Sequence, residues 1–151
     1  MSIRDICTTD VVTIVENESL QKAAQIMRDE HVGALLVVEE GGQGKEVKPL
    51  GIVTDRDIVI KVIAEKENIE NLSVSEAVEE NLVSVKPDAG IHEVLNIMRD
   101  KGVRRAPVID DAQKLIGIIS TDDILNLLAC EIKDVAGIIQ TGQEQEEQRI
   151  H

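Results

Sequence analysis

The chain contains no phenylalanine, tyrosine or tryptophan. Its core must therefore be built from aliphatic side chains. A bound purine base could not stack on an aromatic ring and would have to lie between Val, Ile, Leu and Ala side chains instead. The protein is also nearly transparent at 280 nm, so that any retained nucleotide would dominate its ultraviolet spectrum.

Long apolar runs are also missing. No run approaches the roughly 20 residues of a membrane helix, and residues 1–10 lack the apolar centre of a signal peptide. We therefore expect a cytoplasmic protein. The formal net charge is -13, from 29 acidic and 16 basic residues. Because a field of that sign repels phosphate polymers and anionic lipids, it argues against binding to nucleic acid or to a membrane surface.

Cysteine and histidine are scarce, with two and three residues. Cys7 and Cys130 lie far apart in the sequence, each among apolar neighbours, which favours two buried structural thiols over a redox pair. No cysteine and histidine residues have the spacing of metal ligands, and no serine or cysteine has a recognisable base nearby. The sequence therefore predicts neither a metal site nor intrinsic catalysis.

The chain does contain one pattern twice, which is the feature that decides its organisation. The segment MRDEHVGALLVV, which begins at Met27, aligns with MRDKGVRRAPVI, which begins at Met98, at an offset of 71 residues (98 − 27). The same offset holds from Arg4 to Val38. The first copy then has a longer connection, EEGGQGKEVKP against DDAQK, so the later segments align at an offset of 66 residues (117 − 51).

Each copy has the hydrophobic pattern of a β-α-β-β-α unit. Apolar residues at i, i+3, i+4 and i+7 from Leu20, and again from Ile91, predict two amphipathic helices. We expect an α/β (α+β) fold in which the repeats pack sheet to sheet about a pseudo-twofold axis, because neither repeat can bury both faces of its sheet alone. Short apolar runs predict strands at 11–15, 34–38, 50–53, 82–85, 106–109 and 115–119.

The pattern divides the chain into three parts. Residues 1–70 form the first repeat, 71–136 form the second, and 137–151 form a polar tail. Each repeat ends in a helix, from Asp57 to Ala64 in the first copy and from Asp122 onward in the second. Beyond Gly137 the sequence TGQEQEEQRIH is polar and lacks caps, so we expect a frayed or disordered tail.

Two eight-residue segments, GIVTDRDI and GIISTDDI, repeat the pattern G-x-x-[ST]-x-x-D-I. The spacing puts a hydroxyl (Thr54, Ser120) at the end of a strand and a carboxylate (Asp57, Asp123) in the first turn of a helix. The hydroxyl and the free N–H groups of such a turn suit phosphate oxygens, while the carboxylate can accept both hydrogens of a ribose diol. The hydroxyl could equally cap the helix without any ligand, for about 1 kcal/mol.

Together these segments resemble the tandem CBS (cystathionine β-synthase) domains, whose paired form is called a Bateman module. The resemblance covers about residues 2–129 and includes the repeat heads DICTTDVVTI and SEAVEENLVSV, the segments LQKAAQIMRDEHVGALLVV and IHEVLNIMRDKGVRRAPVI, and both motifs. The chain looks like a stand-alone module. The resemblance implies binding of an adenosyl ligand (AMP, ADP, ATP or S-adenosylmethionine) between the repeats, and pairing through helices into a homodimer.

Carried over residue by residue, the resemblance implies two ligand sites. In each site the motif Asp holds the ribose, the motif Ser or Thr lies near phosphate, and residues beside the motif or on the first two strands line the cleft. The implied ligand-binding residues are Thr54, Arg56, Asp57, Ile52, Ser120, Asp123, Ile118, Arg104, Arg105, Val12, Thr13, Ala34, Val83 and Ser84, with Gly33 and Asp122 beside them.

The two implied sites differ in charge. Arg56 precedes the first motif Asp, whereas Asp122 holds that place in the second copy and would oppose phosphate unless Arg104 or Arg105 compensates. We expect the second motif to depend on these two arginines, and one of the two sites to be empty or degenerate. Since side chains alternate along a strand, one arginine should reach the cleft while the other faces solvent or a partner.

Two functions remain open at this point. The first is a regulatory or sensory module that binds an adenosyl ligand and changes its shape or association. The second is a ligand-independent dimeric scaffold for a separate effector protein. We expect a homodimer in both cases, because the apolar positions after Asp57 and Asp123 could supply a shared surface.

Overall fold

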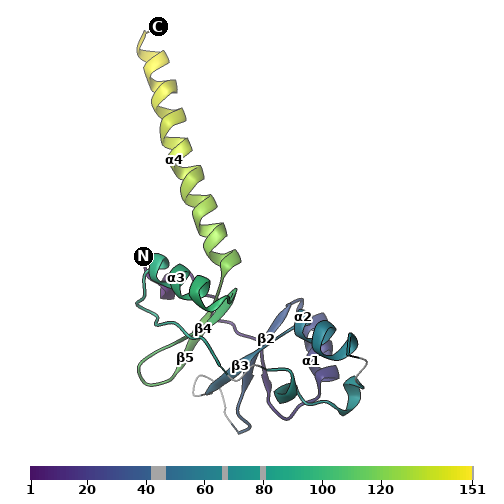
Figure 1. Ribbon diagram of the computed structural model, residues 1–151. Coiled ribbons are helices and arrows are strands. Elements are labelled where there is room, and N and C mark those ends of the chain that lie inside the picture. The colour runs from purple at the N-terminus through teal and green to yellow at the C-terminus, as the bar shows by residue number, and fades with distance from the viewer. Residues whose placement is uncertain (42–46, 66–67, 79–80, 151) are drawn as a thin grey trace.

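The computed structural model describes residues 1–41, 47–65, 68–78 and 81–150, in which the two repeats form two small sheets with their own helices (Figure 1). The first repeat contains the 3-10 helix η1 (Ile3–Asp5), β1 (Thr13–Val15), α1 (Leu20–Glu30), β2 (Ala34–Val38), β3 (Pro49–Thr54), α2 (Asp55–Asp57) and the π-helix η3 (Ile58–Ile63). The second contains the 3-10 helices η4 (Ile69–Asn71) and η5 (Val74–Glu76), α3 (Ile91–Lys101), β4 (Arg105–Ile109), β5 (Leu115–Ser120) and α4 (Thr121–Ile150).

The strands pair as a β-α-β-β pattern requires. β1 is parallel to β2, β2 is antiparallel to β3, and β4 is antiparallel to β5. The strand expected over 82–85 is reduced to one parallel bridge, in which the Val85 N–H donates to Pro107 O and the Ile109 N–H donates to Val85 O, both at 3.0 Å. The bridge ends quickly because Pro87 follows, and proline has no N–H to donate.

The two sheets pack directly against each other. Leu35 and Val37 of β2 lie in the core of the first repeat, with α1. The alternate residues Leu36 and Val38 point to the opposite face, where they pack with Leu115 of β5. The expected sheet-to-sheet packing of two α+β repeats is confirmed.

The head of each repeat packs on the other repeat. Ile3 is fully buried in the core of the second repeat, and its N–H donates to Ala89 O at 3.0 Å. Val74 is fully buried in the core of the first repeat, and its N–H donates to Glu18 O at 2.8 Å. The repeat pattern does not reveal this exchange, because hydrophobic spacing shows which positions are buried and not which copy buries them.

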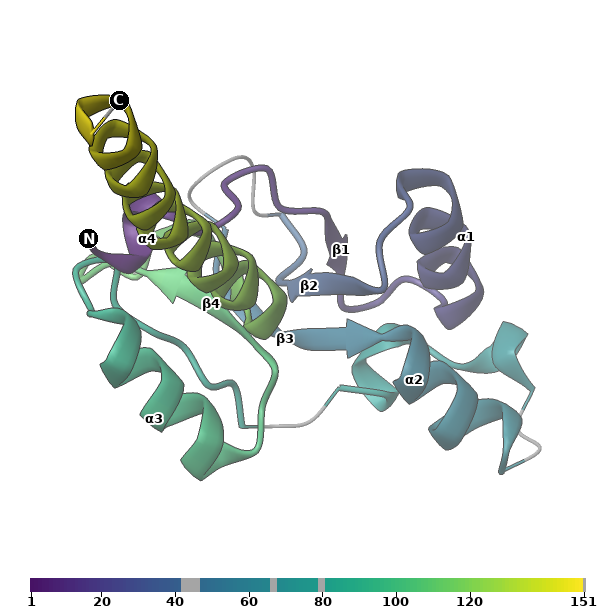
Figure 2. The same cartoon turned by 90° about the horizontal axis from the view of Figure 1, so that it is seen from above.

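Helix α4 continues far beyond the second repeat as a straight rod (Figures 1 and 2). The structure has helix from Thr121 to Ile150 where the sequence analysis expects a frayed tail over 137–151; His151 lies outside the described residues. Polarity alone does not prevent a helix, since the Glu and Gln residues of this segment have high helix propensity. Despite its length, neither α4 nor any other helix in the described ranges is apolar enough to cross a membrane.

The two cysteines are free thiols in different surroundings. Cys7 is half-buried against the core of the second repeat, and this burial raises the pKa of its thiol, so that little of it is thiolate at neutral pH. Cys130 is exposed on α4, and the expectation of a buried thiol is wrong there. Its apolar sequence neighbours do not bury it, because successive residues of a helix point in different directions.

Gly117 lets the N-terminal segment approach β5 closely. Thr8 and Ile118 exchange two backbone hydrogen bonds, each 2.9 Å long. A Cβ atom at residue 117 would lie 2.5 Å from Thr8 O and 2.9 Å from Cys7 Sγ. Only glycine leaves room for this contact.

We expect Gly117→Ala to lower the free energy of unfolding by about 1–3 kcal/mol, because the added methyl group must displace backbone. Gly137→Ala is the matched control, since no atom lies within 4 Å of its missing Cβ and alanine favours a helix. Urea denaturation followed by circular dichroism measures both variants. Equal midpoints for Gly117→Ala and the wild type would contradict the close approach.

Candidate functional site

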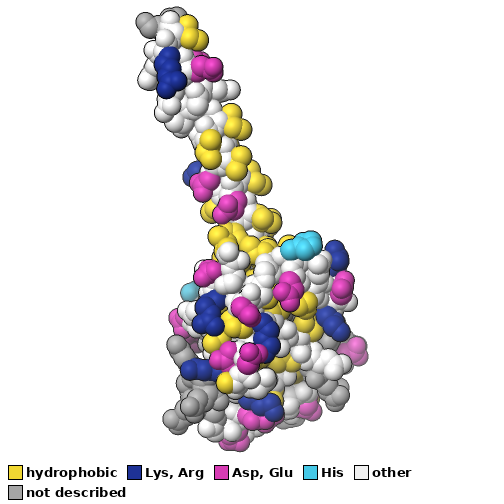
Figure 3. Space-filling view, turned by 90° about the vertical axis from the view of Figure 1, so that its left-hand side faces the viewer, with side chains coloured by type: hydrophobic (Ala, Val, Ile, Leu, Met, Phe, Trp, Pro, Cys, Tyr) yellow, Lys and Arg dark blue, Asp and Glu magenta, His cyan; other side chains and the backbone are white. Residues whose placement is uncertain are grey.

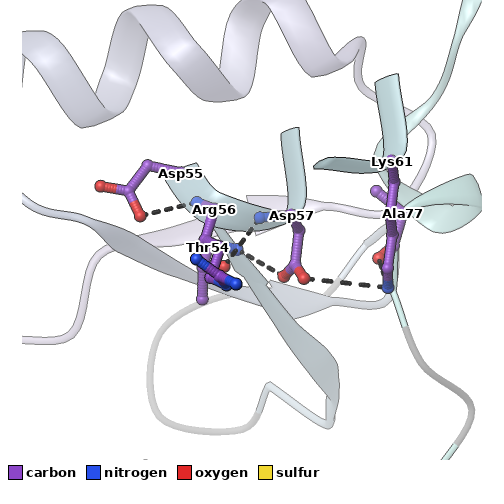
Figure 4. A network of polar contacts seen from close by, with 6 residues as sticks. All are labelled: Thr54, Asp55, Arg56, Asp57, Lys61 and Ala77. Atoms are coloured by element: carbon purple, nitrogen blue, oxygen red, sulfur yellow. Dashed lines mark hydrogen bonds and ion pairs between the residues drawn. The ribbon is translucent and has the colours of Figure 1, made fainter. Parts of the chain in front are cut away.

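The first motif forms a capping box between β3 and α2 (Figure 4). The Asp57 N–H donates to Thr54 Oγ1 at 3.1 Å, and the Thr54 N–H donates to Asp57 Oδ2 at 3.0 Å. Asp57 Oδ1 lies 3.8 Å from Lys61 Nζ, which also donates to the carbonyl oxygen of Ala77 at 3.0 Å. The capping role of this hydroxyl is confirmed, and the carboxylate is held in place by the same turn.

The second motif forms an equivalent turn between β5 and α4. The Ser120 N–H and the Ser120 hydroxyl both donate to Asp123 Oδ2, at 2.8 Å and 2.7 Å. The Asp123 N–H donates back to Ser120 Oγ at 3.1 Å. The repeated spacing therefore produces the same side-chain geometry in both copies.

A backbone hydrogen bond ties each turn to the middle strand of its own repeat. The Asp55 N–H donates to Gly33 O at 3.0 Å, just before β2, and the Thr121 N–H donates to Arg104 O at 2.9 Å, just before β4. These pairs are related by the same offsets as the motifs. Each motif turn is thus fixed by local contacts that need no ligand.

The first motif turn lines a cleft between the repeats, here called cleft A, with a volume of about 410 Å³. One wall is the β3–α2 turn of the first repeat. The other wall comes from the second repeat, before β4 and around the bridge at Val85. The lining residues are Gly51, Ile52, Thr54, Asp55, Arg56, Asp57, Asn81, Leu82, Val83, Gly102, Val103, Arg104 and Arg105.

The second motif turn lines a smaller cleft, here called cleft B, with a volume of about 230 Å³. One wall is the β5–α4 turn, and the other wall comes from the first repeat, around β1 and β2. The lining residues are Thr8, Asp10, Val11, Val12, Val32, Gly33, Ala34, Leu36, Arg105, Ile118, Ser120 and Asp123.

Each motif turn therefore faces the middle strand of the other repeat. Arg104 and Arg105 line cleft A with Thr54 and Asp57, whereas Asp123 lines cleft B with Gly33 and Ala34. The expectation that both arginines serve the second motif is wrong. Sequence alone could not assign the strands to the motifs, because both arrangements bury the same apolar positions.

Both arginines border cleft A, which corrects the expectation that one of them points away. Arg104 precedes β4, so the alternation of side chains along a strand does not apply to it. Arg105 begins β4 and borders clefts A and B together. A single guanidinium group is therefore shared between the two clefts.

The two clefts differ in formal charge. Cleft A is lined by three arginines (residues 56, 104 and 105) and two aspartates (residues 55 and 57), for a formal charge of +1. Cleft B is lined by Asp10, Asp123 and the shared Arg105, for a formal charge of -1. None of these arginine side chains forms a salt bridge within the ranges that the structure describes. Their donors are available to a ligand in either cleft.

Every residue of the predicted ligand-binding set lines one of the clefts except Thr13 and Ser84. Both are exposed, and each follows a residue that does line a cleft, Val12 or Val83. Side chains on an extended chain alternate between faces, so adjacent residues cannot both point into one cleft. Asp122 is exposed and also lies outside both linings, which removes the carboxylate that was expected to oppose phosphate.

Sequence reasoning missed cleft residues that come just before the strands. Asp10 and Val11 line cleft B, and Asn81 and Leu82 line cleft A. These pairs are related by the offset of 71 residues, as are Val12 and Val83. Applying the offset to every candidate position would have found them, because equivalent residues line equivalent clefts.

A family model of the CBS domain matches the chain twice, at residues 3–64 and 74–130. The chain belongs to the CBS domain family. The two matches correspond to the two repeats, and the fold of a CBS domain pair is confirmed by the solved structures that resemble it.

Hypoxic response protein 1 of Mycobacterium tuberculosis is 37% identical over 121 residues, which is 80% of this chain and 80% of the relative. A crystal structure of Hypoxic Response Protein I with two coordinated zinc ions has a TM-score of 0.71 and 35% identity, covering 83% of this chain and 98% of that chain. In the described part of the present chain, no three His, Cys, Asp or Glu side chains lie close enough to hold a metal ion.

Two other relatives extend the comparison. An uncharacterized protein of Methanopyrus kandleri is 33% identical over 127 residues; the match covers 84% of this chain, which spans only 62% of that relative's length. A crystal structure of a CBS domain pair in complex with 5′-methylthioadenosine and S-adenosyl-L-methionine has a TM-score of 0.72 and 26% identity, covering 85% of this chain and 99% of that chain.

Capping by the motif predicts a stability effect that is independent of any ligand. Thr54→Ala should lower the free energy of unfolding by about 1 kcal/mol, because the Asp57 N–H loses its acceptor. Thr54→Ser keeps the hydroxyl and is the matched control. Urea denaturation of nucleotide-free protein measures both, and a Thr54→Ala variant as stable as Thr54→Ser would contradict the capping role.

Proposed function

We propose that this chain is a regulatory module that binds adenosyl ligands in clefts A and B. Cleft A carries the proposal, because Asp57 and Thr54 lie across it from Arg104 and Arg105 in a space of about 410 Å³. The ribose diol would donate to the Asp57 carboxylate, and the arginines would bind phosphate through charge-assisted hydrogen bonds. The CBS domain pair that binds two adenosyl compounds supports this ligand class.

Aliphatic side chains would hold the adenine base. Ile52 and Val83 line opposite walls of cleft A, and Ile118 and Val12 are their equivalents in cleft B. The proposed activity is binding alone, without catalysis. It is supported by the motif carboxylates, which lie in separate clefts, each within a capping turn, and do not form a paired acid and base.

Charge distinguishes the ligands that the two clefts would prefer. Cleft A, with a formal charge of +1, suits phosphorylated ligands such as AMP, ADP or ATP. Cleft B is smaller and has a formal charge of -1 from Asp10, Asp123 and Arg105, so it suits an adenosyl ligand without phosphate. S-adenosylmethionine fits that description, since its sulfonium and ammonium groups are cations.

Regulation would act through association of the module. Val59, Ile60 and Ile63 of η3 are 52%, 44% and 61% exposed, and Leu125 and Leu128 hold similar positions in the first turns of α4. We propose that these apolar residues pair in a homodimer. A ligand that binds one arrangement of the dimer more tightly than another would shift the balance between them and alter contact with an effector protein.

A ligand-independent scaffold is the second candidate function. The two capping turns favour it, because they already use the motif hydroxyls and carboxylates to stabilise helices. Under this alternative the homodimer would bind its effector protein equally well with and without adenosyl compounds.

Calorimetric titration with AMP, ATP and S-adenosylmethionine tests the proposal. We expect AMP and ATP to bind in cleft A, and Asp57→Asn to weaken their binding at least tenfold while keeping an acceptor for the Thr54 N–H. Asp123→Asn is the matched control for this cleft and should change AMP binding less than twofold. Absence of binding at millimolar concentrations of all three compounds would contradict the proposal and favour the scaffold.

The shared arginine predicts an unequal effect of two neighbouring substitutions. Arg104→Met should weaken AMP binding about tenfold, the loss of one charge-assisted hydrogen bond, and leave S-adenosylmethionine binding unchanged. Arg105→Met should change the affinity for both compounds, because this side chain borders both clefts. The same titrations measure these affinities. Identical profiles for the two variants would contradict the separate positions of the two guanidinium groups.

A further inference from the structure

The projecting part of α4 has a helical structure that the chain's own contacts do not explain. The CBS domain match ends at residue 130, and residues 128–150 are all exposed. Figures 1 and 2 show this segment leaving the two sheets as a rod. A single helix of about 20 residues is only marginally stable in water, and Gly137 and Gly142 weaken this one further. The rod therefore needs a partner.

One side of α4 carries an apolar seam that the described residues leave uncovered. Its members are Leu125, Leu128, Ile132, Val135 and Ile139, which are 66%, 44%, 70%, 58% and 59% exposed. Figure 3 shows hydrophobic side chains gathered along the rod. The members follow one another at alternating intervals of three and four residues. This average period of 3.5 is typical of helices that wrap around each other in a coiled coil.

The residues around the seam also suit another α-helix. Ala129 and Ala136 flank the seam, and their small side chains allow a second backbone to approach closely. The charged residues Lys133 and Asp134 lie at positions that face away from the seam. Continuing the spacing beyond Ile139 leads to glycine and then to glutamate, so the apolar seam ends there.

A second copy of the chain is the partner that this seam fits. Two identical seams match in length and spacing when they are related by a twofold axis. The seam begins at Leu125 and Leu128, which belong to the surface of the homodimer proposed above, so the two α4 helices would start at one interface. A membrane surface fits poorly, because the rod ends in Glu144, Glu146 and Glu147 and anionic lipids repel such a segment.

We propose that residues 125–139 of α4 pair with the same residues of a second copy as a short two-stranded coiled coil. The seam spans about two heptads, fewer than an independent coiled coil needs. The pairing therefore adds to the contacts between the repeats, and it rests on the homodimer of the proposed function.

Photo-crosslinking of the full chain tests the pairing. A benzophenone amino acid replaces Ile132 on the seam or, as the matched control, Lys133 on the opposite side, in an equal mixture of ¹⁴N- and ¹⁵N-labelled protein without ligand. We expect crosslinks that join α4 peptides of both isotopes, at least tenfold more often from residue 132 than from residue 133. Crosslinks that stay within one copy, that reach only the repeats of the second copy, or that are equally frequent from both positions would overturn the proposal.

A pair of charged variants gives a second readout on helix formation. Ile132→Glu with Ile139→Glu places charges in the seam, whereas Gln140→Glu with Thr141→Glu adds the same charge outside it. The first variant should lose ellipticity at 222 nm corresponding to most of the projecting segment, and the control should not. Equal ellipticity of the two variants would overturn the coiled coil. Light scattering separates this result from the proposed function, since a dimer without α4 crosslinks overturns only the coiled coil and a monomer overturns both.

Discussion

The packing of Leu36 and Val38 on Leu115 is the contact on which the two clefts depend. Helices cover one face of each sheet, and the other face can be buried only against the sheet of the other repeat. This packing brings each motif turn opposite the middle strand of the other copy. The exchanged heads, in which Ile3 and Val74 are each buried in the opposite core, hold the same arrangement. Neither repeat alone contains a complete cleft.

The capping turns and the proposed ligand sites are compatible uses of the same residues. A carboxylate has two oxygens with about four acceptor positions, and the turn hydrogen bonds of Asp123 both go to Oδ2. The hydrogen bond from the Thr54 N–H likewise holds Asp57 through Oδ2. A ligand would therefore meet a carboxylate whose position is already fixed, and binding would cost little side-chain entropy.

Much of the fold could be predicted from the repeat, because hydrophobic periods of 2 and 3.6 residues identify strands and helices directly. The same periods cannot say which copy covers a buried face, and for that reason the assignment of Arg104 to the second motif was wrong. Thr13 and Ser84 failed for a local reason, since a family position was carried over without regard to strand alternation. The expectation for the tail failed because composition was weighed over helix propensity, and α4 continues to Ile150.

Helix α4 has its first turn at cleft B and its last turn in solvent. Asp123 lines the cleft, and Ile150 lies on the same unbroken helix, about 40 Å further along at 1.5 Å per residue. The displacement of a stiff rod grows with distance from its pivot, so a tilt of about 5° at Asp123 moves Ile150 by roughly 3.5 Å over that helical length. The helix is therefore a lever that converts a small rearrangement around one carboxylate into a movement as large as a side chain.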